Sequence, residues 1–435
     1  MRIDSLTLNN FRNFEHKRFE FSSHFTVVIG DNGKGKSTIL QGLRLAAATF
    51  LLGIDEAERL HIDKEDVRRI DSSKRFVPQK NCYFEAHWNE FGNEISWKRT
   101  RPSAGAQRTT YKEAKQMIEY AEELNYRVNE QKEENVDLPV LCFFGTARLW
   151  TDAKQTFKLK KKGSLLKDGY ARCLAFKPDK ITPFEWIKSY YWKYLKEYKE
   201  RYFFEQFENK KPNKMLVDGD VLFAVLEAIA TCVPNWRPEE WDEDSDDLTG
   251  VYTYEDGSSA YVPLFYLSDG LRTMATLVAN IAYRCAVLNG HHGKNAVKES
   301  RGIVLIDELD MHIHPTWQKH VVADLKKAFP YIQFIATTHS EHIVQSLESN
   351  ELINLDRLSD VSPNELRIDE VATEIMGVES PYSLENQKKY VQAKTFLKDL
   401  KGGHATNGKL DEQLAAVSDP GLRAFLELNK MAQGK

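Results

Sequence analysis

The sequence predicts an α/β fold in which a mixed sheet is joined by an antiparallel side sheet. Short runs of branched apolar residues at 26–29, 138–144, 303–306 and 332–337 have the composition of buried parallel strands. These runs lead into turns that carry glycine, acidic or hydroxyl side chains, and helical periodicity resumes after several of them. Other segments alternate polar and apolar residues, which is typical of half-buried antiparallel strands.

The segment 30–38 reads G-x-x-x-x-G-K-S-T and follows the first apolar run. The apolar residues after it keep helical spacing, so it lies between a strand and a helix, which is the context of a P-loop. Its glycines let backbone N–H groups cradle phosphate oxygens at the helix N-terminus. We expect Lys36 to reach the β- and γ-phosphates and Ser37 to place its hydroxyl on Mg²⁺. An ordinary glycine turn is the alternative, which the spacing and context disfavour.

Composition limits the classes of protein that fit. With 435 residues, we expect one large domain with insertions, or two lobes. A formal net charge of −4 gives no global positive field for nucleic acid, although local basic patches could still bind it. Five scattered cysteines without C-x-x-C indicate a reducing cytoplasm, and neither a zinc site nor a disulfide framework. Without a signal segment or a membrane-length apolar run, we expect a cytoplasmic protein.

Four segments of the N-terminal half predict antiparallel strands. They are 3–14 with its turn, 17–21, and a hairpin of 82–88 with 94–98. Residues 53–80 are charged and irregular, and we expect a loop beside the nucleotide. The Lys- and Glu-rich stretch 111–135 predicts a solvated helix. Arg148 follows the buried run at 138–144, where it contacts either a phosphate or a surface carboxylate.

The middle of the chain leaves several alternatives open. The basic run 158–162, with Lys167, favours a solvated loop over a phosphate-backbone contact. Residues 183–232 are helical and aromatic, which favours helix packing, although neighbouring lysines also suit nucleic acid. The acidic stretch 239–247 indicates a linker, and a metal site there is the less favoured alternative.

A second group of polar residues follows the later strands. Ser268 is a good N-cap for a helix that begins near Asp269. Asp307 and Glu308 end a buried run, which puts one carboxylate on Mg²⁺ and leaves the next to act as base toward a water. His339 follows the last of the four runs.

Together these residues resemble the heads of ABC-type ATPases, the class that includes the SMC, Rad50, RecF and OLD families. Five motifs carry the resemblance, in the chain order of that class. They are Walker A (Lys36, Ser37), the signature (Leu267-Ser268-Asp269-Gly270), Walker B with its catalytic glutamate (Asp307-Glu308), the D-loop (Asp310) and the switch histidine (His339).

The resemblance implies a head-to-tail dimer that sandwiches two ATP molecules with Mg²⁺. The contacts expected in cis are Arg12, Asn32, Gly33, Gly35, Lys36, Ser37 and Thr38, with Arg12 flanking the adenine. The contacts expected in trans are Ser268, Asp269, Gly270 and Asp310. By the same resemblance, Ser37 and Asp307 hold Mg²⁺, Glu308 polarises the attacking water, and His339 senses the γ-phosphate.

The sequence departs from the class in two places. Asp269 stands where transporter ATPases usually carry Gly, and no convincing Q-loop glutamine is present, with 143–148 in its region. His312 and His314 follow Walker B as a His-x-His-Pro commonly does in these ATPases, so a structural role is favoured over a metal site.

Related classes of ATPase fit less well. A transport ATPase has a far shorter stretch between its motifs, and the long coiled coil of SMC or Rad50 needs sustained heptads. No set of residues typical of a Toprim nuclease follows His339, so we expect no intrinsic nuclease activity.

We expect an N-terminal part of the ATPase head at 1–150, an inserted helical lobe at 151–250, a C-terminal part of the head at 251–360 and a helical tail at 361–435.

Two stretches, 139–150 and 306–315, resemble bacterial antiphage ATPases, in particular the Septu ATPases and their retron-associated relatives. The ATPase of the PARIS system is a near alternative. The resemblance implies a slowly hydrolysing sensor and scaffold that forms oligomers and restrains an effector nuclease of the HNH class. The alternative is a RecF- or Rad50-like ATPase that clamps DNA in repair. DNA or a retron nucleic acid is a further candidate partner, and no membrane partner is expected.

Overall fold

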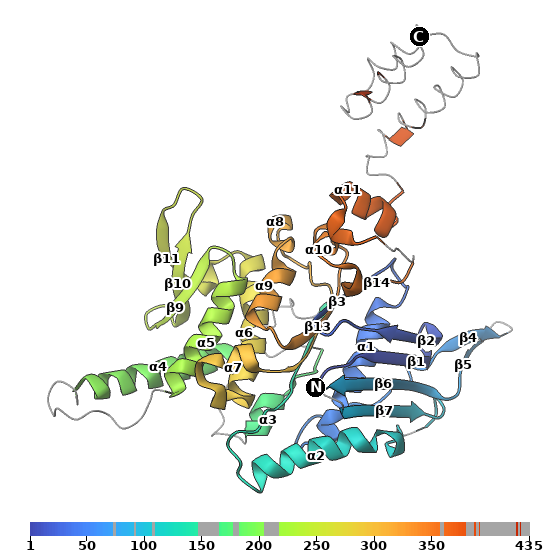
Figure 1. Cartoon of the computed structure of the whole chain (residues 1–435), viewed down its shortest axis with the longest axis horizontal. Coiled ribbons are helices and arrows are strands. Elements are labelled where there is room, and N and C mark those ends of the chain that lie inside the picture. The colour runs from blue at the N-terminus through green and yellow to red at the C-terminus, as the bar shows by residue number, and fades with distance from the viewer. Residues whose placement is uncertain are drawn as a thin grey trace. The chain divides into compact units, whose positions relative to one another are not determined.

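Five parallel strands form the central sheet of the computed structural model, in the order β14-β3-β13-β12-β8, of which β14, β3 and β13 are labelled in Figure 1. In that order they span Leu352–Asn354, Phe25–Ile29, Ile332–Thr337, Gly302–Ile306 and Val140–Phe144. The last four are buried along their whole length, as their continuous apolar sequence requires. The prediction of buried parallel strands is confirmed.

The structure describes residues 1–72, 75–90, 93–106, 109–146, 165–176, 182–203, 217–356 and 361–379, with 387, 388, 391, 423, 424 and 427. The chain divides into two compact units, Met1–Leu366 and Arg367–Lys435. The second unit contains α11 (Ile368–Glu370) and a π-helix (Val371–Ile375). Arg148, the basic run 158–162 and most of the expected terminal helix lie outside the described residues. No helix in the described ranges is long and apolar enough to cross a membrane.

A four-stranded antiparallel sheet, β2-β1-β6-β7, forms the predicted side sheet. Its strands are Phe14–Glu20, Ser5–Phe11, Cys82–Glu90 and Asn93–Arg101. Helix α1 (Lys36–Ala48) contacts β1 and β6 on one side and β12 and β13 on the other, so it lies between the two sheets. Gly42 of α1 lets the helix approach β1, because a Cβ there would lie 2.7 Å from a methyl group of Leu8.

The expected loop at 53–80 contains regular structure that the sequence did not indicate. Just before it, a 3₁₀ turn (Phe50–Gly53) packs against α2 (Lys115–Asn129). Within it, β4 (Arg69–Ser72) pairs with β5 (Arg75–Pro78) in a two-stranded ribbon. All four residues of β5 are exposed, so the ribbon has no alternating apolar face that sequence periodicity could show. A 3₁₀ turn at Lys112–Ala114 precedes α2.

The helices of the middle region pack through their aromatic side chains. They are α3 (Leu165–Tyr170), α4 (Thr182–Phe203), α5 (Val217–Cys232) and α6 (Asp269–Leu288). Trp186 of α4 meets Tyr283 of α6 with ring centroids 5.9 Å apart, and Tyr194 meets Phe223 of α5 at 5.1 Å. The favoured interpretation of these aromatics as packing residues is confirmed for these pairs.

The acidic stretch 239–247 is not a linker, and that prediction is wrong. Strands β9 (Trp236–Asp242), β10 (Asp247–Thr253) and β11 (Ser259–Pro263) form a three-stranded antiparallel sheet. Trp236 and Trp241 are buried, while Glu239 and Glu240 between them are exposed. The acidic residues therefore occupy the outer side of a half-buried strand. The linker prediction rested on the acidic composition of this stretch and overlooked the buried tryptophans.

The C-terminal part of the first unit is made of short elements. They are a 3₁₀ turn (Leu264–Tyr266), a 3₁₀ segment (Gly290–Asn295), α7 (Ala296–Glu299), α8 (Pro315–Gln318), α9 (Val321–Ala328), α10 (Glu341–Gln345) and 3₁₀ turns at Ser349–Glu351 and Pro363–Glu365. The stretch after His314 contains two short helices, α8 and α9. His314 caps α8, with its Nδ1 accepting from the Thr316 N–H, which confirms a structural role for this histidine.

Candidate nucleotide-binding site

The P-loop lies at the carboxyl edge of the central sheet, between β3 and α1. Gly33 has φ 84° and Gly35 has φ 108°, a backbone conformation that residues with a Cβ rarely adopt. A Cβ on Gly35 would also lie 2.6 Å from the ring of Phe14. Gly35 is the N-cap of α1, so the unpaired N–H groups of a long helix open toward the loop. The loop is built to receive an anion.

Lys36 is half-buried at the first position of α1. Its Nζ donates to the carbonyl oxygen of Gly30 at 2.5 Å and to that of Asp31 at 3.3 Å. Burial lowers the pKa of Lys36, and the nearby carboxylates of Asp356 and Asp307 oppose this shift. The ammonium group therefore lies inside the loop, where it can exchange carbonyl contacts for phosphate oxygens.

A cluster of hard oxygen atoms joins the P-loop to β12 and β13. Ser37 Oγ lies 3.4 Å from Oδ2 of Asp307, whose Oδ1 accepts from the Thr337 hydroxyl at 2.7 Å. Mg²⁺ is usually held by one or two protein oxygens together with phosphate oxygens and waters. Ser37 and Asp307 supply such a set, so the residues present fit the ion.

Glu308 is held in an uncommon backbone conformation with φ 52°. Its N–H donates to the Thr337 hydroxyl at 2.8 Å, and the N–H of Leu309 donates to the Thr337 carbonyl at 2.8 Å. Backbone strain of this kind persists only where the surroundings hold it, and it gathers at functional sites. The two bonds to Thr337 position Glu308 directly after Asp307, at the edge that carries the P-loop.

His339 and Asp310 interact within one head. The Asp310 Oδ1 accepts from the Thr338 hydroxyl at 2.5 Å and from the His339 N–H at 3.2 Å. The side chain of His339 is exposed beyond the end of β13. One oxygen of Asp310 is thus used to fix the segment that carries His339, and the expected contact of Asp310 in trans remains a prediction.

Arg12 is fixed by a buried carboxylate. Its side chain pairs with Asp66, which is 1% exposed, at 2.7 Å, and its backbone N–H donates to the Asp66 carbonyl. Gln41 of α1 also donates to Asp66, at 3.4 Å. Asp66 comes from the segment expected as a loop beside the nucleotide. A role of Arg12 at the adenine remains a prediction.

The signature residues begin α6. Ser268 is its N-cap, as predicted, and its side chain makes no capping hydrogen bond. Asp269 pairs with Arg272 on the exposed first turn. A Cβ on Gly270 would lie 2.4 Å from the carbonyl oxygen of His312, so this turn packs directly on the backbone after Walker B.

Two residues of the site were not singled out from the sequence. Asp356 follows β14, where its Oδ2 accepts from the Asp31 N–H at 2.5 Å and its Oδ1 pairs with Lys34 at 3.0 Å. Thr337 bridges Asp307 and Glu308. Both lie at carboxyl ends of strands in the central sheet, where α/β proteins bind ligands, so their position after predicted strands could have identified them.

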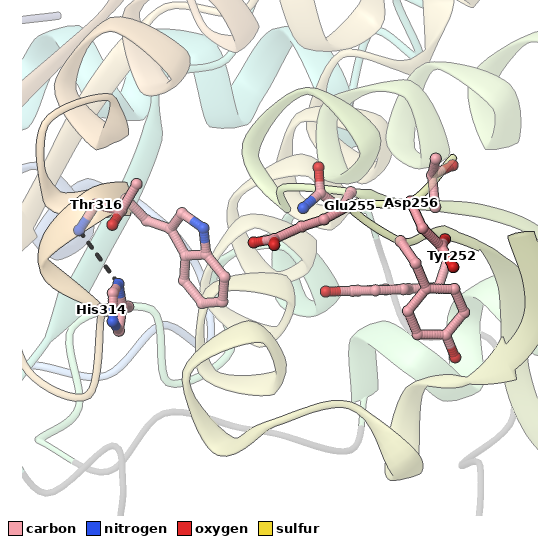
Figure 2. A pocket seen from close by; sticks show the side chains of 9 residues that line it. Tyr252, Glu255, Asp256, His314 and Thr316 are labelled. Carbon is pink, nitrogen blue, oxygen red and sulfur yellow. Dashed lines mark hydrogen bonds between the residues drawn. The ribbon is translucent and has the colours of Figure 1, made fainter. Parts of the chain in front are cut away.

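A separate cavity of about 650 Å³ lies beside α8 and the β10–β11 turn (Figure 2). Tyr252, Glu255 and Asp256 line one side, and His314 and Thr316 line the other. Trp317 also lines it and lies near Gly270, so this cavity borders the signature side of the head and not the P-loop.

The P-loop, the paired carboxylates after β12, the histidine after β13 and the signature at the start of α6 define an ABC-type P-loop ATPase. Family comparisons agree with this class. Residues 5–219 match a family described as "AAA domain", and residues 154–345 match one described as "AAA domain, putative AbiEii toxin, Type IV TA system".

The chain is similar in sequence to retron and Septu ATPases. It is 26% identical over 388 residues to the "Retron Vc95 probable ATPase" of Vibrio cholerae, covering 81% of this chain and 73% of that protein. It is 33% identical over 130 residues to the "Septu protein PtuA" of Bacillus thuringiensis, covering 27% of this chain and 33% of the relative. An SMC head domain from Thermotoga maritima is similar over 83% of this chain and 97% of that chain, with 14% identity and a TM-score of 0.38.

Proposed function

We propose that this ATPase is the sensor and scaffold of a bacterial antiphage defence system, in which it forms oligomers and regulates an effector nuclease. The observation that carries the proposal is the contact of the P-loop Ser37 with Asp307, which Thr337 holds in place, combined with sequence similarity to retron and Septu ATPases. A regulator of this kind needs ATP to control assembly, and slow turnover suits that task.

In the cis half-site, each residue has one task. Lys36 binds the β- and γ-phosphates, and Ser37 and Asp307 hold Mg²⁺, which neutralises the charge that develops on the phosphates. Glu308, positioned by Thr337, orients a water and accepts its proton. His339 lies beyond the neighbouring strand end and contacts the γ-phosphate side.

The second half of each site comes from another copy of the chain. Ser268 and Gly270 lie at the N-terminus of a 20-residue helix, where unpaired N–H groups and the helix dipole favour an anion. The free Ser268 side chain and the exposed first turn suit a γ-phosphate presented by a partner. ATP then closes a dimer of heads, and hydrolysis reopens it.

The regulated partner is an effector nuclease of the HNH class. The support for this step is the sequence similarity to a Septu protein. A nucleic acid could serve as the signal that changes the assembly.

The test is affinity purification of the chain expressed from its native operon, followed by mass spectrometry and native mass determination. We expect a stable complex that contains a small nuclease, in a defined stoichiometry above the monomer. Recovery of the ATPase alone, as monomer or dimer, would contradict the defence proposal.

A DNA-stimulated ATPase assay separates the competing function. A RecF- or Rad50-like clamp would show hydrolysis that rises with DNA and binding that weakens steeply with salt. We expect neither effect for a scaffold that restrains an effector.

A further inference from the structure

A cluster of two histidines and one aspartate lies away from the nucleotide site. Asp137 precedes β8, and His291 and His292 belong to the 3₁₀ segment that leads through α7 to β12. β8 and β12 are neighbours in the central sheet, paired from Val140 and Gly302 onward. Because Asp137 precedes these strands while the P-loop follows β3, the cluster lies at the amino edge of the sheet, opposite the ATP site.

Three ligand atoms converge in this cluster. The Oδ1 of Asp137 lies 3.0 Å from Nε2 of His291 and 2.7 Å from Nε2 of His292. One ligand atom from each of the three residues lies within 4.8 Å of the others. Ligands on one tetrahedral Zn²⁺, with bonds of about 2.0–2.2 Å, lie roughly 3.3 Å apart, and each of the two Asp137–histidine distances is within about 0.6 Å of that separation.

A second carboxylate supports one of the histidines from behind. The Nδ1 of His292 lies 2.8 Å from Oε2 of Glu299, and the other oxygen of Glu299 accepts from the Asn295 side chain at 2.9 Å. Histidines that bind metal usually donate their second ring N–H to a carboxylate, which fixes the tautomer and the ring orientation. Glu299 stands in the place of that carboxylate, on the opposite side of the His292 ring from Asp137.

The surroundings of His292 offer a place for a cation. Both of its nitrogens face carboxylate oxygens, and a neutral imidazole can donate through only one of them. When Nδ1 donates to Glu299, the lone pair of Nε2 points toward Asp137 and is available to a metal ion. A metal ion also uses the lone pair of His291.

The backbone that carries the cluster is rigidly held. The buried Asn289 side chain accepts from the Leu138 N–H at 2.8 Å, donates to the Leu138 carbonyl at 3.0 Å and donates to Ser300 at 2.9 Å. Gly293 turns the chain after the histidines with φ 55°. The two segments that supply the ligands are thus joined independently of any ion, and the site is preorganised.

Charge and access also suit a metal ion. Asp137 contributes a carboxylate oxygen and the two histidines contribute ring nitrogens, an oxygen and nitrogen ligand set that suits a divalent cation. The Asp137 side chain is 72% exposed, whereas those of His291 and His292 are 15% and 23% exposed. Solvent reaches the site from one side, where a water can complete the coordination.

We propose that Asp137, His291 and His292 bind a divalent transition metal ion, with Zn²⁺ the best match to two imidazoles, one carboxylate and a water. The ion would tie the start of β8 to the segment before β12, which joins the two sequence-distant halves of the head. Its role is structural, because the site lies at the opposite sheet edge from the P-loop.

The test uses the full chain purified through a tag that contains no histidine. Elemental analysis of the purified protein should give about one zinc per chain. After removal of metal with EDTA and dialysis, we expect Zn²⁺ to raise the melting temperature by about 2–4 °C. Co²⁺ in place of Zn²⁺ should give the visible absorption of a low-coordinate site.

The variants His291→Ala and Asp137→Asn should lose the zinc, the melting shift and the cobalt spectrum, while ATP binding is retained. Asp137→Asn keeps the size of the side chain, so it separates loss of the ligand from loss of packing. His320→Ala, which removes an exposed histidine elsewhere, is the matched control and should keep all three signals. Wild-type protein without bound zinc and without a response to Zn²⁺ would overturn the proposal, as would equal zinc content in the ligand variants.

Discussion

The ammonium group of Lys36 shows how a single residue is prepared for its ligand. It is half-buried and held by two carbonyl oxygens of its own loop, and burial lowers its pKa. A phosphate offers stronger, charge-assisted hydrogen bonds at the same place. The ammonium group is therefore already partly removed from water before a phosphate binds.

We expect Lys36→Ala to weaken ATP binding by about 100-fold or more, because one charge-assisted contact contributes roughly 1.5–3 kcal/mol and the lysine contacts more than one phosphate. Isothermal titration with ATP and Mg²⁺ measures the change. Lys319→Ala, at an exposed lysine after α8, should bind like the wild type. Unchanged affinity in Lys36→Ala would remove this residue from the phosphate site.

Glu308→Gln should reduce ATP hydrolysis by about 10²–10⁴-fold and leave ATP affinity nearly unchanged, because only the base function is lost. A phosphate-release assay with an ATP titration separates these two effects. Glu365→Gln replaces an exposed carboxylate on a 3₁₀ turn and serves as the control. Ordinary turnover in the Glu308 variant would show that another group acts as base.

At the scale of elements, the ends of β12 and β13 are joined by the side chain of Thr337. Thr337, the last residue of β13, is fully buried, and its hydroxyl both donates to Asp307 and accepts from the Glu308 N–H. The conformation of Glu308 thus depends on a side chain from the neighbouring strand. The separation of the two strands in the chain explains why the sequence did not show this contact.

Thr337→Val should lower the free energy of unfolding by about 1–3 kcal/mol and the hydrolysis rate by at least about tenfold, since a buried N–H and a carboxylate lose their shared partner. Thr337→Ser keeps the hydroxyl and should restore most of the activity. Urea unfolding and the phosphate-release assay give the two quantities. If Val and Ser variants hydrolyse ATP at the same rate, the bridge has no role in positioning Glu308.

The contact between α6 and the turn after Walker B gives a second prediction at this scale. Gly270→Ala places a Cβ 2.4 Å from the His312 carbonyl oxygen, so the start of α6 must move. We expect a loss of about 1–3 kcal/mol in the free energy of unfolding. In Gly105→Ala the new methyl group meets nothing within 4 Å, so this control should change stability by less than about 0.5 kcal/mol. Equal melting temperatures for both variants would refute the close packing.

At the scale of the whole molecule, the nucleotide edge is built from distant parts of the chain. Because the five strands of the central sheet are parallel, their carboxyl ends bring together the P-loop, Asp307, His339 and Asp356. The signature lies instead at the start of α6, against the backbone of His312. This arrangement suits a site completed by a second copy.

We expect Glu308→Gln with ATP and Mg²⁺ to form a stable dimer of heads, visible as a doubled mass by light scattering during gel filtration. Adding Ser268→Arg should block that dimer, because a bulky cation replaces the small hydroxyl at the helix N-terminus, while each chain still binds ATP. Persistence of the dimer in the double variant would place the interface elsewhere.

The sequence alone predicted much of the fold and the class of ATPase. Buried parallel strands are recognised in a sequence as continuous apolar runs. A P-loop is a local motif, because its glycines adopt backbone conformations that other residues rarely adopt. The N-cap position of Ser268 and the strand that ends just before Asp307 are local in the same sense. Features that depend only on residues close together in the chain can be predicted from the sequence.

Contacts between distant segments were decided only by the tertiary structure. Strand order sets which residues end side by side, so Thr337 beside Asp307, Asp356 against the P-loop and Asp137 against His291 have no signature in the linear sequence. The sheet at 236–263 was missed because its acidic residues face outward over buried tryptophans. The sequence by itself determined the class of ATPase, through motifs whose geometry is local; the pairing of strands decided how these motifs are supported, because hydrogen bonds across a sheet join residues that the chain keeps far apart.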